Sequence, residues 1–242
     1  MVDLTSRQIQ ILRAVVDEYL KTAEPVGSDT IDKRYNLGVS PATIRNEMVY
    51  LSEQGYLKQP HTSAGRIPTS TALKLYVKEL MSKKDLTVAD EVSVKERIWE
   101  TKDDLDKLLQ EATRVLADRT KSIGIAFTND KHAYHAGYSY LLGYPELNNV
   151  DVTRTILSLL EETNQLDTIF NGPWDEDVVH VVFGEDLGNQ YLEQMSITFT
   201  DFTCGTRHCS LGVIGSSRVN YQHVVPMLEY FHDLILGMIP TR

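Results

Sequence analysis

The sequence has 242 residues, of which 42% are hydrophobic, enough for one large domain or two modest ones. Its net charge is −10, and it has neither a run of roughly 18 apolar residues nor an apolar secretory segment near its start, which argues against membrane and secreted proteins. Two cysteines are too few for a disulfide framework, so we expect a cytoplasmic protein.

The charge is distributed unevenly along the chain. Residues 1–84 carry 12 Lys and Arg against 9 Asp and Glu, whereas residues 85–242 carry 12 against 25. The positive excess of the first part is small in itself. A basic N-terminal part on an acidic body nevertheless indicates that the N-terminal part is the one that meets a polyanion.

Two helices are predicted first. In "LTSRQIQILRAVVDEYLKT", Thr5 and Gln8 have the spacing of a capping box, and apolar residues then recur at helical intervals. Pro25 and Gly27 end this helix. Ser28 is expected to cap a short second helix, "DTIDKRYN".

The third predicted helix, "SPATIRNEMVYLSEQG", has Ser40 as its N-cap and buries an apolar face against the first two. A short helix, a tight turn and a second helix with small and polar residues at its exposed start form a helix-turn-helix. Such a helix enters the major groove of DNA, where Arg reads guanine and Asn reads adenine, although a merely solvated face would have similar residues. Thr43, Arg45 and Asn46 are the candidates for base contact, and Ser40 is expected to lie nearest a phosphate. Ala42 and Tyr50 complete the set of candidate DNA-binding residues on this helix.

A β-hairpin is predicted directly after this helix. "GYLKQ" and "GRIPT" read as short strands, and the tip between them is polar. A hairpin in this place is a wing, which lies beside the groove and contacts the DNA backbone. The candidate wing residues are His61, Thr62 and Ser63, Gly65, which allows close backbone approach, and Arg66, which supplies charge.

The acidic body is predicted to be an antiparallel sheet with helices, so that the chain belongs to the α+β class. A hinge is expected at residues 82–90 and a helix at 92–122, interrupted or not near Lys102. Further helices are expected at 152–165 and 221–238. The predicted strands are residues 122–127, 177–183, 195–202 and 210–215.

The body offers few candidates for other chemistry. Cys204, His208 and Cys209 lie close in sequence, but a closed zinc site needs four ligands, so cross-strand neighbours are the simpler interpretation. His132 and His135 have a spacing that could reach one ion, or they belong to a surface loop. We expect no catalytic residue, no metal and no cofactor, and therefore no enzyme. An aromatic-rich run at residues 130–145 leaves one alternative open, a regulator that senses a small-molecule ligand.

The chain resembles the HrcA family of heat-inducible transcription repressors. The similarity runs almost without gaps from Leu4 to about Val77 and is most distinctive in "EPVGS", "SPATIRNEM" and "QPHTSAGR". In the body, "DLDKLLQEATRVLADRTKSIGIAF" and "LGVIGSSRVNYQHVVPMLEY" are similar to the GAF-like domain of the family. The resemblance implies a winged helix at residues 1–81, a linker and connecting helix at 82–104, and a GAF-like effector or dimerisation domain at 105–242.

The resemblance also implies a function and partners. These are repression of heat-shock and chaperone genes through an inverted-repeat operator in double-stranded DNA, a homodimer, and modulation by the chaperonin GroEL. One difference from the family lies between Phe127 and Ala133, where a few residues stand in place of a long middle region with an inserted dimerisation domain. The body is therefore a shortened form. A dimer would have to form through the helix at 92–118, an open sheet edge or the winged helices.

Overall fold

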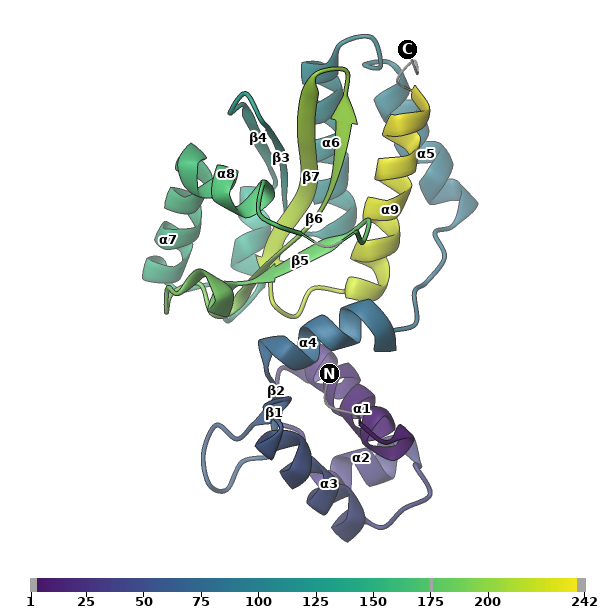
Figure 1. The fold of residues 1–242 in the computed structure, drawn as a ribbon, viewed down its shortest axis with the longest axis vertical. Helices are drawn as coiled ribbons and strands as arrows, with labels where there is room; N and C mark the ends of the chain where they lie inside the picture. The colour runs from purple at the N-terminus through teal and green to yellow at the C-terminus, as the bar shows by residue number, and fades with distance from the viewer. Residues whose placement is uncertain (1–3, 175, 239–242) are drawn as a thin grey trace. The chain divides into compact units, whose positions relative to one another are not determined.

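The computed structural model describes residues 4–174 and 176–238, so the outermost residues of the expected domains lie outside the described part. The chain divides after Ser82 into two compact units (Figure 1). Among the described residues, no helix is both long and apolar enough to span a membrane.

The first unit begins with three helices, α1 (Ser6–Thr22), α2 (Ser28–Tyr35) and α3 (Pro41–Glu53). The expected capping box of Thr5 and Gln8 is confirmed at the start of α1. Ser40 caps α3 by accepting a hydrogen bond from the backbone N–H of Thr43 at 3.2 Å. The expectation that Ser28 caps α2 was wrong, because Gly27 occupies the N-cap and Ser28 is the first helical residue.

The three helices enclose a small apolar core. Ile11, Ile31, Ile44 and Leu51 have no exposed surface, and Met48 is 3% exposed. Burial of a side chain of this size contributes about 1.5–3 kcal/mol. The apolar face predicted for α3 is therefore the buried one, which leaves the polar face of the helix toward solvent.

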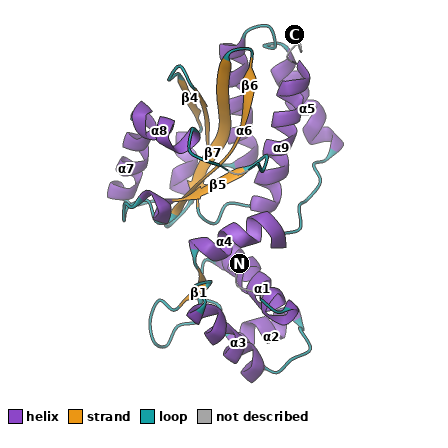
Figure 2. Cartoon of the chain, viewed as in Figure 1, coloured by secondary structure: helices purple, strands orange, loops and turns teal. Residues whose placement is uncertain are grey.

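A wing follows α3. The strands β1 (Leu57–Lys58) and β2 (Ile67–Pro68) pair antiparallel, and Figure 2 shows a loop extending beyond them. Helix α4 (Ser70–Leu75) and a π-helical turn, η1 (Tyr76–Leu80), complete the unit. An isolated bridge between Val26 and Arg66 adds a minimal third strand, so the unit is a winged helix-turn-helix.

The second unit is built on a five-stranded antiparallel sheet in the order β4-β3-β7-β6-β5. Its strands are β3 (Ile123–Thr128), β4 (Ala133–Ala136), β5 (His180–Phe183), β6 (Met195–Cys204) and β7 (Arg207–Ser216). The strands predicted at residues 195–202 and 210–215 are confirmed as β6 and β7, which pair antiparallel as a hairpin. Strand β4 was not predicted, since it lies in the aromatic-rich run that was expected to be a loop or a pocket wall.

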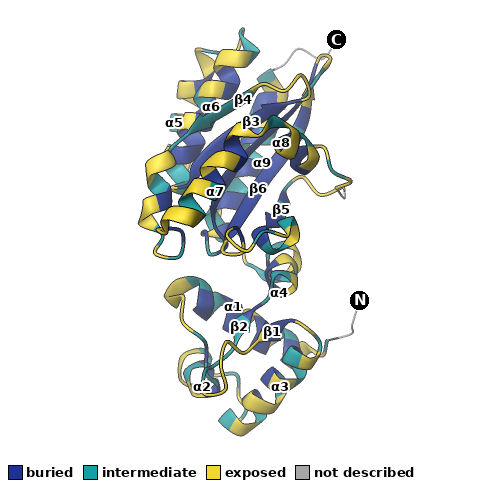
Figure 3. Ribbon diagram, turned by 90° about the vertical axis from the view of Figure 1, so that its left-hand side faces the viewer, coloured by how far each residue is buried: buried dark blue, intermediate teal, exposed yellow. Residues whose placement is uncertain are grey.

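Helices cover both faces of this sheet. Helices α6 (Leu105–Thr120) and α9 (Tyr221–Met238) pack on one face. The short helix η2 (Tyr138–Gly143) and helices α7 (Val150–Glu161) and α8 (Thr163–Phe170) cover the other, over a core that contains Phe127, Phe170 and Phe199. Because both faces are covered, the strands are buried over most of their length (Figure 3). The predicted α+β class and the antiparallel sheet with helices are confirmed.

Several helix boundaries differ from those expected. The helix expected at 92–122 is two helices, α5 (Val88–Trp99) and α6, because the chain turns at residues 100–104 and Asp104 caps α6. Helix α5 also occupies the end of the expected hinge, with Thr87 as its N-cap. The helix expected at 152–165 breaks at Glu162 into α7 and α8. A short 3₁₀ helix, η3 (Gly184–Leu187), follows β5.

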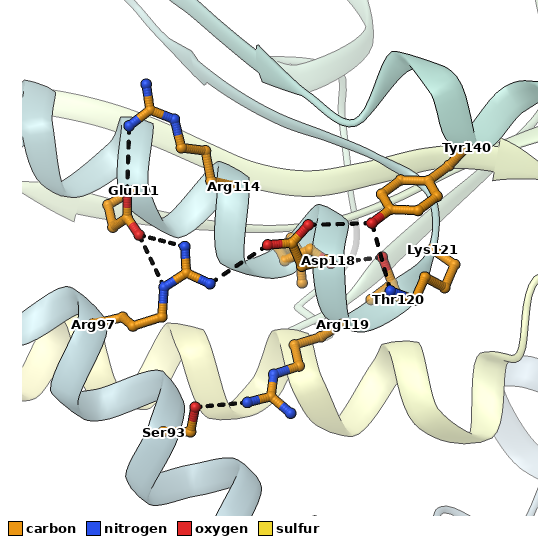
Figure 4. Close-up of polar contacts among 10 residues, drawn as sticks. Ser93, Arg97, Glu111, Arg114, Asp118, Arg119, Thr120, Lys121 and Tyr140 are labelled. Carbon is orange, nitrogen blue, oxygen red and sulfur yellow. Dashed lines mark hydrogen bonds and ion pairs between the residues drawn. The ribbon is translucent and has the colours of Figure 1, made fainter.

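Helix α5 is fastened to α6 by charged side chains (Figure 4). The guanidinium of Arg97 donates hydrogen bonds to Glu111 at 3.0 and 2.7 Å. Arg119 of α6 reaches back to Ser93 at 2.7 Å and pairs with Asp90 at 2.8 Å. These contacts make α5 part of the second unit.

Candidate nucleic-acid interface

The start of α3 presents the side chains that the sequence predicted. Ile44 and Met48 are buried in the core, and the candidate positions of α3 lie away from it. Ser40, Ala42, Arg45 and Asn46 are exposed, and Thr43 and Tyr50 are half-buried. The hydroxyl groups of Ser40 and Thr43 lie 3.0 Å apart. Six side chains of different chemistry are thereby available on one outward-facing surface.

The orientation of α3 is held by a carboxylate on its inner side. Glu47 accepts hydrogen bonds from Arg7 Nε at 2.7 Å and from Gln8 Nε2 at 3.0 Å, both on α1. Arg7 Nη2 also lies 2.6 Å from the same carboxylate, whose side chain is 12% exposed. The hydrogen bonds from Gln8 and then from Arg7 lower the pKa of Glu47. The charged form of Glu47 therefore stabilises the packing of α3 on α1.

Glu47→Gln is expected to lower the free energy of unfolding at pH 7 by about 1 kcal/mol. Because folding lowers this pKa, the contribution is complete above the ordinary carboxyl pKa of about 4.3 and is lost as the pH falls through the lowered value. Urea unfolding at pH 7 and near pH 3 measures the difference, which should shrink at the lower pH. A difference that is the same at both values contradicts a role for the charge.

The tip of the wing is braced from within. The side-chain amide of Gln59 donates to the backbone oxygens of Thr62 at 3.0 Å and Ala64 at 2.9 Å. The backbone N–H of Ala64 donates to His61 at 2.9 Å. His61, Thr62 and Ser63 are all exposed. Hydrogen bonds within the tip therefore fix the backbone that carries these three exposed polar side chains.

Gly65 has an intramolecular role. The backbone groups of Val26 and Arg66 exchange two hydrogen bonds of 2.9 Å directly beside it. A Cβ atom at Gly65 would lie 2.4 Å from the carbonyl oxygen of Val26, which is too close for any side chain. The close backbone approach expected at this glycine is thus made by the chain itself. It fastens the wing to the segment between α1 and α2.

A cleft of about 400 Å³ lies between α3 and the wing. It brings together five of the candidate residues, namely Arg45, Thr62, Ser63, Gly65 and Arg66. The other candidates, Ser40, Ala42, Thr43, Asn46, Tyr50 and His61, do not line it. Its remaining walls are Val26, Gly27, Ser28, Met48, Val49, Gln59 and Ala64. Ser28 and Gln59 were not predicted as site residues, because Ser28 reaches the cleft only through the packing of α2 and Gln59 is marked only by its hydrogen bonds within the wing.

The arginines of the first unit fall into two groups. Arg7 pairs with Glu47, Arg13 with Asp17 at 3.8 Å, and Arg34 with the buried Glu18. Arg45 and Arg66 form neither an ion pair nor a side-chain hydrogen bond with any residue in the described part of the chain. Both arginines are lining residues of the same cleft, one from α3 and one from the wing. Such an arrangement suits an anionic partner.

The rival sites of the second unit have structural explanations. Cys204 and Cys209 face one side of the sheet and His208 faces the other, because residues alternate along the β6–β7 hairpin. The described residues contain no group of three or more His, Cys, Asp or Glu side chains suited to a metal ion. In the aromatic-rich run, Tyr134 donates to Asp106 at 2.6 Å and Tyr140 to Asp118 at 3.2 Å. These tyrosines join β4 and η2 to α6.

Two family models match the chain. One is described as "Winged helix-turn-helix transcription repressor, HrcA DNA-binding" and matches residues 3–82. The other is described as "HrcA protein C terminal domain" and matches residues 58–225. Together they span residues 3–225, which include the described part of the first unit and most of the second.

Individual proteins and structures agree with these matches. The heat-inducible transcription repressor HrcA of Clostridium perfringens (strain SM101 / Type A) is 36% identical over 197 residues, which cover 80% of this chain but 58% of that protein. The chain thus spans little more than half the length of that relative. The repressor of the same description from Pelotomaculum thermopropionicum is 27% identical over 328 aligned positions, 94% of each protein. A crystal structure of a hypothetical protein has a similar fold, with a TM-score of 0.75 at 19% identity over 98% of both chains.

Proposed function

This chain belongs to the HrcA family, and we propose that it is a sequence-specific DNA-binding repressor of heat-shock and chaperone genes that acts on an inverted-repeat operator. The observation that carries the proposal is that Arg45 and Arg66, which have no side-chain partner among the described residues, line one cleft from α3 and from the wing. In a winged helix, the helix reads base edges in the major groove and the wing grips the backbone beside it. Arg45 with Thr43 and Asn46 is then the reading surface.

A binding selection on random duplexes tests this function. The expected result is a recovered motif made of two inverted half-sites, with centres separated by a whole number of helical turns. Heparin at moderate ionic strength serves as the competitor, because it offers charge without base edges or grooves. Equal retention on every duplex and on heparin contradicts sequence-specific binding.

An inverted repeat requires two copies of the winged helix, and we propose that helix α5 pairs them. The edge strands β4 and β5 have only four residues each, and short edges discourage strand pairing. Helix α5 instead exposes three apolar side chains, with exposed fractions of 74% for Val88, 48% for Val92 and 47% for Trp99. Together with Lys95 they follow one another at intervals of 4, 3 and 4 residues, which is the spacing of a helix–helix seam. Lys95 has Glu91 and Glu96 beside it, so two copies that pack antiparallel present opposite charges to each other.

The double substitution Val92→Glu with Trp99→Glu is expected to convert the homodimer to a monomer, because four buried carboxylates would face one another. Light scattering with and without operator DNA measures the mass. Leu142→Glu is the matched control, since Leu142 is 58% exposed and lies on η2, across the sheet. A dimer that survives the double substitution, or a wild-type monomer on DNA, contradicts this interface.

Two other expectations remain predictions. Sensing of a small-molecule ligand by the body has weak support in the aromatic-rich run, since only Leu142 of that run lines the cleft of about 430 Å³ beside α7. A thermal-shift screen with metabolites separates a sensor from a purely heat-responsive repressor. Modulation by the chaperonin GroEL rests on the resemblance alone. It is physically reasonable because domains are stable by only about 5–15 kcal/mol, so modest heating depletes the active form.

A further inference from the structure

The two cysteines of the sequence lie together near the turn of the β6–β7 hairpin (Figure 1). In the register of this hairpin, Cys204 lies opposite Arg207, and Cys209 lies opposite Phe202. The two cysteines are therefore diagonal neighbours on the same face of the sheet. Cys209 has no exposed surface, and Cys204 is 9% exposed beside the turn. The pair is thus enclosed but can be reached from the turn.

The two thiol groups interact with each other. A hydrogen bond between them lowers the pKa of Cys204 and raises the pKa of Cys209. Cys204 is therefore the sulfur that ionises more readily, and Cys209 is the one that keeps its proton. The thiol of Cys209 also donates to the backbone oxygen of Arg207 at 3.8 Å. A single proton thus lies where a cation shared by the two sulfur atoms would lie.

A guanidinium group stands beside this pair. Arg207 donates from Nη1 to Asp106 at 2.7 Å and from Nη2 to Asp130 at 3.2 Å. Its Nε is buried and has no hydrogen-bond partner among the described residues. After the hydrogen bond between the thiols and their burial, the charge of Arg207 acts next and lowers the pKa of both. Negatively charged sulfur ligands would therefore have a positive charge and a free N–H donor beside them.

The register separates the kinds of chemistry open to two thiols. Diagonal neighbours have Cα atoms about 7–8 Å apart, whereas a disulfide needs about 4.4–6.8 Å. A direct bond would require a shift of Cys209, which the pairing with Thr128 of β3 holds in place. One metal ion between two thiolates can span the diagonal, with a bond of about 2.3 Å to each sulfur as in zinc thiolate sites.

The number of ligands identifies the ion. Zinc needs four ligands, and the described part of the chain contains no group of three or more His, Cys, Asp or Glu side chains suited to a metal ion. Thiolates are soft ligands and select Cu(I). A monovalent ion also leaves less charge to be balanced, because two thiolates and one Cu(I) carry one negative charge in total.

We propose that Cys204 and Cys209 form a two-coordinate site for Cu(I) in the second unit, with Arg207 as its positively charged neighbour. The ion takes the place of the proton between the sulfur atoms, and this proton is released to water as the second metal–sulfur bond forms. The free Nε of Arg207 donates to the negative thiolate complex. The site is independent of the proposed function, and it revises the expectation that the chain binds no metal.

The experiment titrates the full, reduced chain without oxygen against Cu(I) held by bicinchoninate, whose colour fades as the ion is transferred. The expected result is transfer of one Cu(I) per chain, with no other thiol in the sequence to compete. Cys204→Ser and Cys209→Ser should each lower the affinity about a hundredfold or more, and Arg207→Met about tenfold. His208→Ala is the matched control, because His208 faces the other side of the same hairpin, and it should change nothing.

X-ray absorption of the loaded wild type keeps the test independent of how well the variants fold. Two sulfur neighbours and no nitrogen neighbour are expected. A wild type that takes no Cu(I) from the chelator overturns the site, and so does a nitrogen neighbour or a loss of binding in His208→Ala. If the chain takes no Cu(I) but a mild thiol oxidant joins the two sulfur atoms, the cysteines are a redox pair instead, and the metal site is overturned.

Discussion

Arg45→Ala is expected to weaken binding to the selected operator by about 1–3 kcal/mol and to change binding to random DNA far less. The reason is geometric, because a guanidinium group forms two parallel hydrogen bonds to one guanine, and a wrong base offers no such pair of acceptors. Arg45 is exposed on α3 and has no partner within the described chain that would have to be released first. Its whole hydrogen-bonding capacity is therefore available to a base. Fluorescence anisotropy with operator and scrambled duplexes measures both affinities.

Two further variants separate recognition of the base sequence from non-specific electrostatic binding to DNA. Arg45→Lys keeps the charge but loses the planar fork, so it should lose most of the preference and retain most of the non-specific affinity. Arg66→Ala should weaken binding to all sequences and lower the slope of log K against log salt by about 0.9, because one phosphate contact is lost. Equal losses on operator and scrambled DNA for Arg45→Ala contradict a role in base reading.

Gly65→Ala is expected to detach the wing from the helices and to destabilise the first unit by about 1–3 kcal/mol. The added methyl group would lie 2.4 Å from the carbonyl oxygen of Val26, and that oxygen belongs to backbone that cannot rotate away. Relief requires opening the two hydrogen bonds between Val26 and Arg66. The loss of the fixed wing should then reduce affinity for every duplex. Thermal unfolding and DNA binding measure the two effects.

Ala64→Gly is the matched control for this substitution. It removes a methyl group next to Gly65 and makes the tip more flexible, but it adds no atom near Val26. A loss that is confined to Gly65→Ala assigns the effect to the collision. Equal losses in both variants would instead assign it to flexibility of the tip.

Much of the first unit could be predicted because its signals are local. The capping box at Thr5 and the cap at Ser40 act within one helical turn. The apolar face of α3 recurs at the helical period, and its burial leaves Arg45 and Asn46 outward whatever the details of packing. The polar wing tip follows from the lack of apolar residues between two short strands. These local signals suffice to place the candidate residues on the exposed side of α3 and at the wing tip.

The body was harder to predict because its decisive contacts join neighbouring elements and leave no periodic signal within either element. Strand β4 exists because residues 133–136 pair with β3 across a tight turn, and its half-buried aromatic and small residues have no clear strand period. The break between α5 and α6 likewise allows α5 to fold back onto α6, where Arg97 donates a hydrogen bond to Glu111. Helical periodicity continues through such a turn without a strong signal.

The sequence by itself determined the helix-turn-helix and the side chains that its third helix exposes, since both depend on spacing within a few residues. It also determined the charge difference between the N-terminal part and the acidic body, which is a sum over residue types. Only the tertiary structure decided that Val26 crosses Gly65, that Ser28 lines the same cleft as Arg66, and that Arg45 and Arg66 have no side-chain partner within the described residues. Each of these facts depends on segments separated by roughly 20 to 40 residues. Their proximity is set by the packing of the core and not by local preference.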